Sequence, residues 1–277
     1  MKCLSPIQIL NKSTQEYIDV PCGRCPSCLI RYRDQWKWRL SKEYQSFGYQ
    51  GLFFTLTYSD ENVPIKDVSG YPIQVLDKSH LKSFLKHVRN KVDYFNRLHQ
   101  DDIIKYRYFC VGEYGSHTFR PHYHGLIFSD HLDFFRDSLC DWSLGFIEVK
   151  DIIPEHLQYV CKYTLKQLVP YCQDMDIPLP FSLMSKGIAF DYLNSQEFID
   201  GHYSFKPFVY DFKGYRIPMP RYVRNHSYTL DEWNSYHDKV SGEVQNSPSI
   251  VHQFDDLTSL SFHLQSIIDK AHDLDKI

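Results

Sequence analysis

The order of apolar patterns between residues 51 and 168 constrains the fold more than any other feature of this chain. Residues 51–58 are an aromatic and β-branched run typical of a strand, and residues 78–99 repeat apolar side chains at helical spacing. The pattern continues as strand, strand, helix, strand and helix over residues 105–114, 121–128, 132–142, 145–149 and 154–168. The first six elements follow the split β-α-β-β-α-β order. We therefore predict an α+β, ferredoxin-like fold, an antiparallel sheet with helices on one face.

Weaker patterns flank this block. Residues 7–20 predict a hairpin, a Cys-rich turn follows, and residues 29–47 predict an amphipathic helix. A chain of 277 residues is long enough for one large domain or for a core with appendages. We expect an N-terminal hairpin, turn and basic helix packed on the core (1–50), the core itself (51–170) and a C-terminal extension (171–277).

Charge is distributed unevenly along the chain. The formal net charge of −3 excludes a uniformly basic coat for nucleic acid. Residues 21–40 and 201–230 each hold five basic side chains against one acidic side chain, whereas the chain beyond residue 250 is mainly acidic. The two basic segments are either an electrostatic footprint for nucleic acid or two ordinary solvated faces. Aromatic residues, at 16%, supply both a core and a surface on which bases could stack.

The sequence carries no signal for a membrane span or a leader. No apolar run approaches about 18 residues, and residues 1–14 contain only a four-residue apolar stretch, too short for a signal peptide. We expect a protein of a reducing cytoplasm, whose eight cysteines are thiols or metal ligands before they are disulfides. The motifs GxxxxGK(S/T), GxSxG and HExxH are missing from the sequence, which sets aside a built-in helicase motor and two hydrolase classes.

A first candidate site lies on the predicted hairpin of residues 105–128. His122 and His124 are two residues apart on a strand, so both imidazoles lie on one face. The pair alone is weak, because a chain with 14 histidines contains such a pair by chance. Glu113 ends the preceding strand, and an even register places its carboxylate across from the histidines. One carboxylate and two imidazoles form a three-ligand set with open positions, the arrangement of a catalytic metal.

A second candidate is a tyrosine pair on the predicted helix 154–168. Tyr159 and Tyr163 are four residues apart and share one helical face, and Lys162 and Lys166 lie near that face. Tyrosines at this spacing are commonly core residues. The two lysines argue against full burial, because an ammonium group is seldom buried without a partner.

A third candidate is the cysteine cluster that precedes the helix predicted over residues 29–47. Cys22, Cys25 and Cys28 recur every third residue, and the predicted hairpin could bring Cys3 to them as a fourth thiolate. A structural zinc is the first interpretation. An iron–sulfur cluster is the second, although no further Cys-Pro follows Cys28. The third is free thiols that pack the start of a helix. The remaining cysteines occur in apolar contexts and are predicted to lie in the core: Cys110, Cys140, Cys161 and Cys172.

Four ordered motifs together resemble those of HUH (His-hydrophobic-His) endonucleases, which use the split sheet as their scaffold. The motifs are FFTLTY (53–58), GEYG (112–115), RPHYHG (120–125) and YVCKY (159–163). The upstream PCGRCPSC (21–28), followed by Arg31, Trp36 and Arg39, is similar to replication initiation proteins of gokushovirus-type microviruses, small phages with circular single-stranded DNA. The match covers residues 20–170. Beyond it, residues 185–188 look like a shortened family element, and residues 218–222 are similar to another family segment.

The resemblance implies a rolling-circle replication initiator that nicks and rejoins DNA at a phage origin through a 5′-phosphotyrosyl intermediate. It implies that Glu113, His122 and His124 hold a divalent ion, for which two imidazoles favour Mn²⁺ over Mg²⁺. Tyr159 and Tyr163 would be the nucleophiles, with Tyr159 attacking first because Lys162 follows it three residues later. Lys162 would offset charge on the phosphate or lower the pKa of the tyrosine.

The resemblance also implies the partners. We assign DNA contact to seven cations: Arg24, Arg31, Arg33, Lys37, Arg39, Arg120 and Lys166. The DNA would be single-stranded or supercoiled phage origin DNA. A host helicase and polymerase would be needed because the chain lacks a motor motif, and the protein would act in the cytoplasm of the infected bacterium. Two alternatives remain: another HUH protein, such as a transposase, plasmid initiator or relaxase, or a zinc-stapled DNA-binding protein without enzymatic activity.

Overall fold

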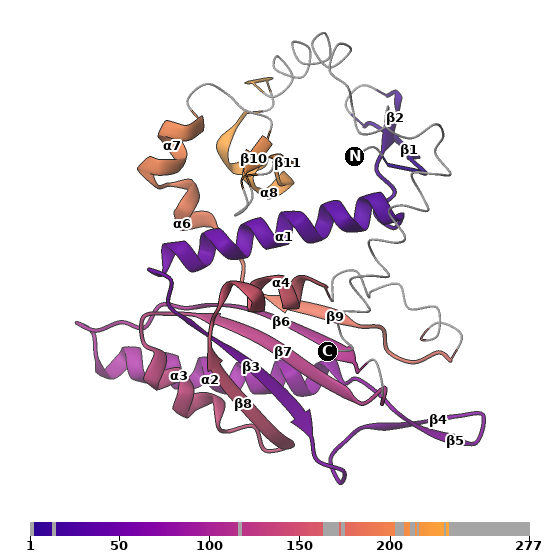
Figure 1. The fold of residues 1–277 in the computed structure, drawn as a ribbon, viewed down its shortest axis with the longest axis vertical. Coiled ribbons are helices and arrows are strands. Elements are labelled where there is room, and N and C mark those ends of the chain that lie inside the picture. Colours follow the sequence, from indigo (N-terminus) through magenta and orange to yellow (C-terminus); the bar gives the residue numbers. More distant parts are fainter. Residues whose placement is uncertain are drawn as a thin grey trace. The chain divides into compact units, whose positions relative to one another are not determined.

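A five-stranded antiparallel sheet carries the three HUH-like motifs 53–58, 112–115 and 120–125. In this computed structural model, which describes residues 3–12, 15–115, 118–162, 172, 175–202, 208–210, 214, 216–229 and 231–232, the strand order is β8-β3-β7-β6-β9 (Figure 1). The strands are β3 (Gly51–Tyr58), β6 (Arg107–Tyr114), β7 (Pro121–Phe128), β8 (Gly145–Asp151) and β9 (Phe181–Met184). The order of β8, β3, β7 and β6 is that of a split β-α-β-β-α-β sheet, so the predicted fold class is confirmed.

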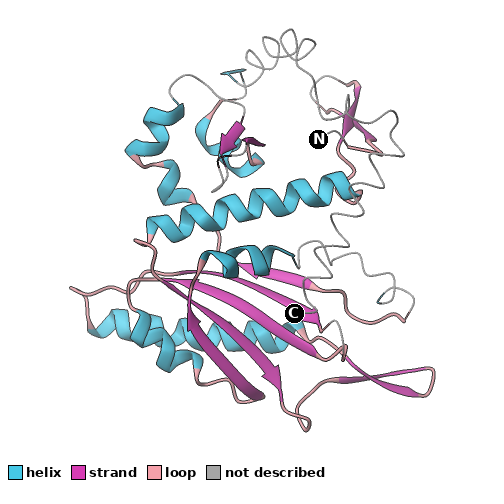
Figure 2. Cartoon of the chain, in the orientation of Figure 1, coloured by secondary structure: helices cyan, strands magenta, loops and turns pink. Residues whose placement is uncertain are grey.

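The two faces of the sheet are covered by different helices. Helices α2 (Lys78–Leu98) and α3 (Leu132–Leu139) lie on one face, and α4 (Pro154–Lys162) lies on the other (Figures 1 and 2). Because side chains alternate along a strand, Leu52, Phe54 and Leu56 point toward α2 and α3 and join the main core. Phe53 and Thr55 therefore point toward α4. The sheet separates a dry core on one side from a partly polar face on the other.

Strand β7 shows why this alternation matters. Tyr123, between the two histidines, points into the core, where its hydroxyl oxygen lies 2.6 Å from that of Tyr58 and donates to the backbone oxygen of Asp77 at 2.6 Å. Both tyrosines are fully buried, and their mutual hydrogen bonds satisfy the hydroxyl groups there. His122 and His124 consequently point to the face under α4. Asp77 also caps α2, accepting a hydrogen bond from the backbone nitrogen of Ser79 at 2.7 Å.

The chain divides into two compact units, Arg39–Tyr192 with the sheet, and Met1–Trp38 together with Leu193–Ile277. Helix α1 (Pro26–Ser46) begins in the second of these units and continues into the first. The other elements are β1 (Ile7–Leu10), β2 (Tyr17–Val20), β4 (Ile65–Val68), β5 (Tyr71–Gln74), α6 (Phe190–Leu193), α7 (Gln196–His202), β10 (Phe208–Tyr210), β11 (Arg216–Pro218) and α8 (Arg221–Ser227). In the part of the chain that is described, no helix is long and apolar enough to cross a membrane.

Most predicted elements are present, and three differences have physical reasons. The hairpin β4–β5 and the edge strand β9 were not predicted, because each strand is only four residues long and β9 is defined by its distant pairing with β6. The prediction that Cys140 lies in the core is wrong: it is exposed, and it donates its thiol to the backbone oxygen of Arg136 where α3 ends. Cys110, Cys161 and Cys172 are buried as predicted. The division at residues 50 and 170 stays a prediction.

Candidate metal and tyrosine site

Strand register brings Glu113, His122 and His124 together beneath α4. In the β6–β7 ladder Glu113 pairs directly with His122, and Val111 pairs with His124. Residues paired across antiparallel strands point to the same face, so the carboxylate lies opposite one imidazole and diagonal to the other. Gly115 and Arg120 close the hairpin through a hydrogen bond from Gly115 N to Arg120 O at 3.0 Å. This closure fixes the even register on which the site depends.

The three side chains converge on one carboxylate oxygen. Glu113 Oε1 lies 2.7 Å from His122 Nε2 and 3.2 Å from His124 Nε2, and the imidazole rings stand at 86° to each other. The Glu113 and His124 side chains are only 4% and 6% exposed, whereas His122 is 19% exposed and marks the open side of the site. Burial alone would raise the pKa of Glu113. Hydrogen bonds and charge from the two histidines outweigh it and lower this pKa to about 2, so the group is a carboxylate at neutral pH.

The hydrogen-bond partners of His122 fit a cation at this point. Its Nδ1 lies 3.0 Å from the backbone oxygen of Arg120, which can only accept, so Nδ1 carries a proton. Its Nε2 faces the Glu113 carboxylate, which is also an acceptor. Either a second proton or a metal ion must lie between Nε2 and the carboxylate. Two imidazole nitrogens and a carboxylate oxygen are a ligand set for Mn²⁺ or Zn²⁺. The residues present therefore fit a divalent ion.

His124 is held on three sides. Its Nδ1 lies 3.0 Å from Thr55 Oγ1 on β3, and its ring stacks on Phe53 with an interplanar angle of 12°. A proton on Nδ1, donated to Thr55, leaves the Nε2 lone pair directed at the site. Phe53 is in turn stacked against His156 of α4 at 4.3 Å between ring centroids. The sequence prediction missed Thr55, Phe53 and His156. The alternation of the motif FFTLTY could have revealed the first two, because they share a face with the paired histidines.

Helix α4 places Tyr159 beside this set. The Tyr159 hydroxyl oxygen lies 3.4 Å from His124 Nε2, and the two rings meet edge to face at 5.0 Å. Lys162 Nζ lies over the Tyr159 ring at 5.5 Å from its centroid. The structure thus brings Tyr159 and Lys162 to the three candidate ligands. Tyr163 and Lys166 lie outside the described residues, so their predicted roles rest on the sequence.

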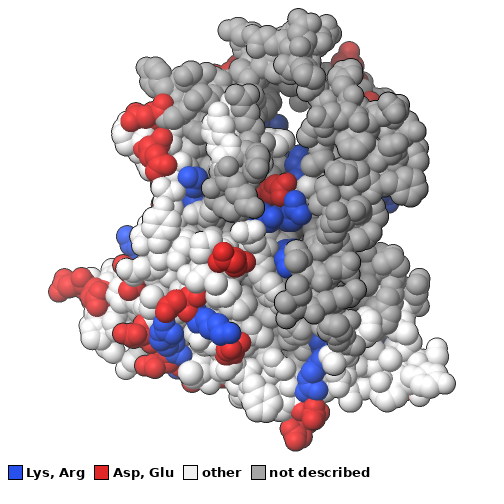
Figure 3. Space-filling view, viewed as in Figure 1, with Lys and Arg blue, Asp and Glu red and all other residues white. Residues whose placement is uncertain are grey.

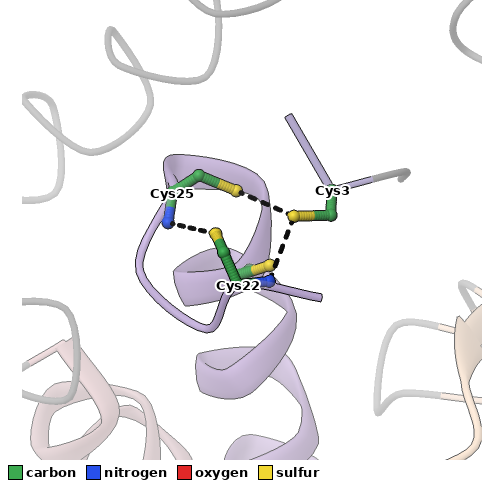
Figure 4. A group of neighbouring side chains, drawn as sticks. Cys3, Cys22 and Cys25 are labelled. Carbon is green, nitrogen blue, oxygen red and sulfur yellow. Dashed lines mark hydrogen bonds between the residues drawn. The ribbon is translucent and has the colours of Figure 1, made fainter. Parts of the chain in front are cut away.

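The four N-terminal cysteines gather in the unit that contains β1 and β2. The sulfur atoms of Cys3, Cys22, Cys25 and Cys28 all lie within 4.8 Å of one another and none forms a disulfide. Figure 4 shows Cys3 approaching Cys22 and Cys25 from a separate segment of chain. The backbone N–H of Arg24 lowers the pKa of Cys22 to about 6, whereas burial raises that of Cys28 to about 12. This is a second group of side chains that could hold a metal.

The cations assigned to DNA contact have different surroundings. Arg24 is exposed, whereas Arg33 pairs with Asp34 at 2.8 Å and Arg39 donates to the backbone oxygen of Ile188 at 3.0 Å. Arg120 is also engaged within the chain, with Asp60 at 2.7 Å and the backbone oxygen of Tyr58 at 2.7 Å. Arg31 and Lys37 are half-buried on α1. On the face shown in Figure 3, described basic and acidic side chains are mixed rather than segregated. The DNA contacts stay predictions.

Comparison with known proteins defines the class first. Residues 51–168 match a family model for the replication-associated protein ORF2, a range that contains the sheet strands β3 to β8 and the whole candidate site. The chain is also similar to the replication-associated protein ORF2 of Spiroplasma virus 4, with 27% identity over 231 residues, 69% of each chain. It is 27% identical over 266 residues to the replication-associated protein VP4 of Bdellovibrio phage phiMH2K, covering 86% of this chain and 78% of that one. These matches confirm the resemblance to phage replication proteins predicted from the motifs.

Among solved structures, the chain matches the N-terminal nuclease domain of the minute virus of mice non-structural protein 1. The match has 15% identity, covers 52% of this chain and 71% of that one, and has a TM-score of 0.17. A TM-score this low carries no structural argument. The fold assignment rests on the strand order of this chain.

Proposed function

We propose that this protein initiates rolling-circle replication of a phage with circular single-stranded DNA by nicking origin DNA with a tyrosine. The observation that carries the proposal is the position of the Tyr159 hydroxyl, 3.4 Å from His124 Nε2 and thus at the edge of the Glu113, His122 and His124 set. A nucleophile beside three convergent metal ligands is the arrangement of a metal-assisted phosphoryl transfer site. The similarity to phage replication-associated proteins supports the biological setting.

The proposed step exchanges one phosphate ester for another. The Tyr159 phenol loses its proton to solvent as its oxygen bonds to phosphorus, and the bond from phosphorus to the 3′-oxygen breaks. The departing 3′-oxygen takes a proton from water and becomes a free hydroxyl that can prime a polymerase. A divalent ion, when bound, would supply Lewis-acid polarisation of the scissile phosphate. Lys162, above the Tyr159 ring, offsets negative charge on the phenolate or the phosphate. Reversal of the same step rejoins DNA, because the phosphotyrosyl ester conserves the bond energy.

The protein residues orient the reactants. Thr55 and Phe53 hold the His124 ring, and Glu113 is kept ionised, so the ligand set is organised before DNA arrives. Tyr163, one helical turn beyond Tyr159 and about 6 Å along the axis, would make the second cut that releases the finished circle. This second role is proposed from the sequence. A host helicase and polymerase in the bacterial cytoplasm would complete the reaction.

The experiment is a nicking assay on labelled single-stranded oligonucleotides that carry phage origin sequence. With Mn²⁺ we expect cleavage and a protein–DNA adduct that survives denaturing electrophoresis, and neither product with a chelator. His122→Ala should lose both products while retaining its circular dichroism, because His122 is at the open side of the site. DNA binding without any adduct would contradict the proposal and favour a DNA-binding protein without enzymatic activity. Release of a finished circle by Tyr163→Phe would exclude the second nucleophile.

A further inference from the structure

We propose that Cys3, Cys22, Cys25 and Cys28 bind one structural zinc ion that fastens the β1–β2 hairpin to the start of helix α1. The proposal is independent of the nicking activity. It concerns the unit that contains the N-terminus, whereas Glu113, His122, His124 and Tyr159 lie in the other unit.

The sulfur positions are close to those of a tetrahedral site. Zinc–thiolate bonds of about 2.3 Å require sulfur–sulfur edges of about 3.8 Å. Cys3 Sγ and Cys25 Sγ are 3.8 Å apart, and all four sulfurs lie within 4.8 Å of one another. An ion at the centre needs the longest separation to shorten by about 1 Å. A disulfide would engage the sulfurs two at a time and leaves the fourfold clustering unexplained.

Each sulfur also has an N–H group directed at it. The backbone N–H of Cys22 donates to Cys3 Sγ at 3.3 Å, that of Cys25 to Cys22 Sγ at 3.3 Å, and that of Leu4 to Cys25 Sγ at 3.5 Å. The guanidinium of Arg31, one turn into α1, lies 4.0 Å from Cys28 Sγ. Four thiolates around Zn²⁺ carry a net charge of −2, and N–H donors to the sulfurs stabilise that charge. Neutral thiols packing a helix start would not need this arrangement.

The backbone between the ligands has the required turn. Gly23 follows Cys22 with a φ of +76°, a left-handed conformation that glycine adopts without strain. This turn reverses the chain so that Cys22 and Cys25 face the same point, and Pro26 then begins α1. Cys28, in the first turn of that helix, is buried, whereas the other three ligands are half-buried.

The hairpin supplies the physical reason for a metal. All four residues of β1 and three of the four residues of β2 are exposed, so the hairpin buries little surface of its own. A two-stranded hairpin is marginally stable in water without further packing. Cys3 immediately precedes the hairpin segment and Cys22 follows it, so one ion would close the loop of residues 4–21 onto the helix. A thiolate zinc contributes directly to the folding of such a segment.

The test measures the metal in the full-length protein. We expect about one zinc per chain by elemental analysis and, by zinc K-edge X-ray absorption, four sulfur neighbours near 2.3 Å. Zinc in the Glu113 and histidine set would instead show nitrogen and oxygen neighbours near 2.0–2.2 Å. The double variant Cys22→Ser/Cys25→Ser should lose the sulfur-bound zinc, and the control Cys140→Ser, which removes an exposed thiol outside the cluster, should keep it.

Hydrogen exchange tests the fastening role on the same wild-type protein. Removing the zinc with a chelator should speed exchange of the β1–β2 amides on the order of tenfold or more, while amides of β3 and β7 change little. No zinc, iron in its place, zinc bound only by nitrogen and oxygen, or a disulfide within the cluster would overturn the assignment. Unchanged exchange in the zinc-free hairpin would overturn the fastening role.

Discussion

Thr55 determines which nitrogen of His124 is available to a metal. Its hydroxyl is 3.0 Å from His124 Nδ1, and hydrogen-bond partners of this kind typically contribute 10- to 100-fold to metal affinity. Thr55→Val keeps the side-chain shape and removes the hydroxyl, so we predict that it weakens Mn²⁺ binding at least about tenfold, measured by calorimetry. Thr57→Val, two residues further along the same face of β3, is the control and should bind like wild type. Equal affinity of Thr55→Val and wild type would contradict this role.

Glu43 is a buried carboxyl group away from the candidate site. It accepts a hydrogen bond from Ala189 N and lies 3.9 Å from Arg107 Nε, while its Oε1 lacks a hydrogen-bond partner within the described chain. Burial, the largest cause, raises the pKa of Glu43. A carboxyl whose pKa is higher in the folded state binds more protons there. Its contribution to stability is therefore full at low pH and is lost as pH rises through the folded pKa.

Glu43→Gln should remove this pH dependence. We predict that the variant and wild type have similar free energies of unfolding near pH 4, and that wild type becomes progressively less stable relative to the variant as the pH approaches 8. Denaturant unfolding at several pH values measures the difference between the two proteins, which cancels the other titrating groups. A difference that grows in the opposite direction would mean that the Arg107 charge outweighs burial.

At the scale of the elements, β3 and β7 approach each other more closely than side chains normally permit. Gly125 pairs with Phe54, and a Cβ added to Gly125 would lie 2.1 Å from the Phe54 ring, which is fully buried. We predict that Gly125→Ala costs about 1–3 kcal/mol or more of unfolding free energy, measured by denaturant titration. The cost should fall in a Phe54→Leu background, where the ring is removed. An unchanged cost there would place the strain elsewhere.

The same alternation explains what the sequence could predict. Period-two patterning and a short hairpin placed Glu113, His122 and His124 on one face, and helical spacing placed Tyr159 on the covering helix, because these are local signals. Pairing of β9 with β6 depends on residues about 70 positions apart, and the chain near residue 181 has no local pattern that specifies it. The approach of Tyr159 to His124 likewise required the packing of α4 on β7. Sequence could name these residues and their shared face, but not their distances.

At the scale of the whole molecule, a net charge of −3 means that DNA must be attracted by local cations. Arg24 is the exposed member of the predicted set for which the structure shows no ion pair among the described residues. We predict that Arg24→Ala weakens binding to single-stranded DNA and lowers the slope of log affinity against log salt by about 0.7. Fluorescence anisotropy at several salt concentrations measures both quantities. Arg136→Ala, which removes an arginine paired with Asp151, is the control; an equal loss in both variants would exclude a specific contact.

The central claim is that Tyr159 becomes covalently joined to DNA at a metal site built from Glu113, His122 and His124. Mass spectrometry of protease-digested adduct, formed with Mn²⁺ on a single-stranded origin oligonucleotide, tests it most directly. The account predicts a nucleotide on the peptide that contains Tyr159, with the modification localised to that residue. It also predicts that Tyr159→Phe loses the initial adduct, while Tyr94→Phe, which alters an exposed tyrosine on α2, forms it normally. An adduct on another residue, or one that persists in Tyr159→Phe, would contradict the account.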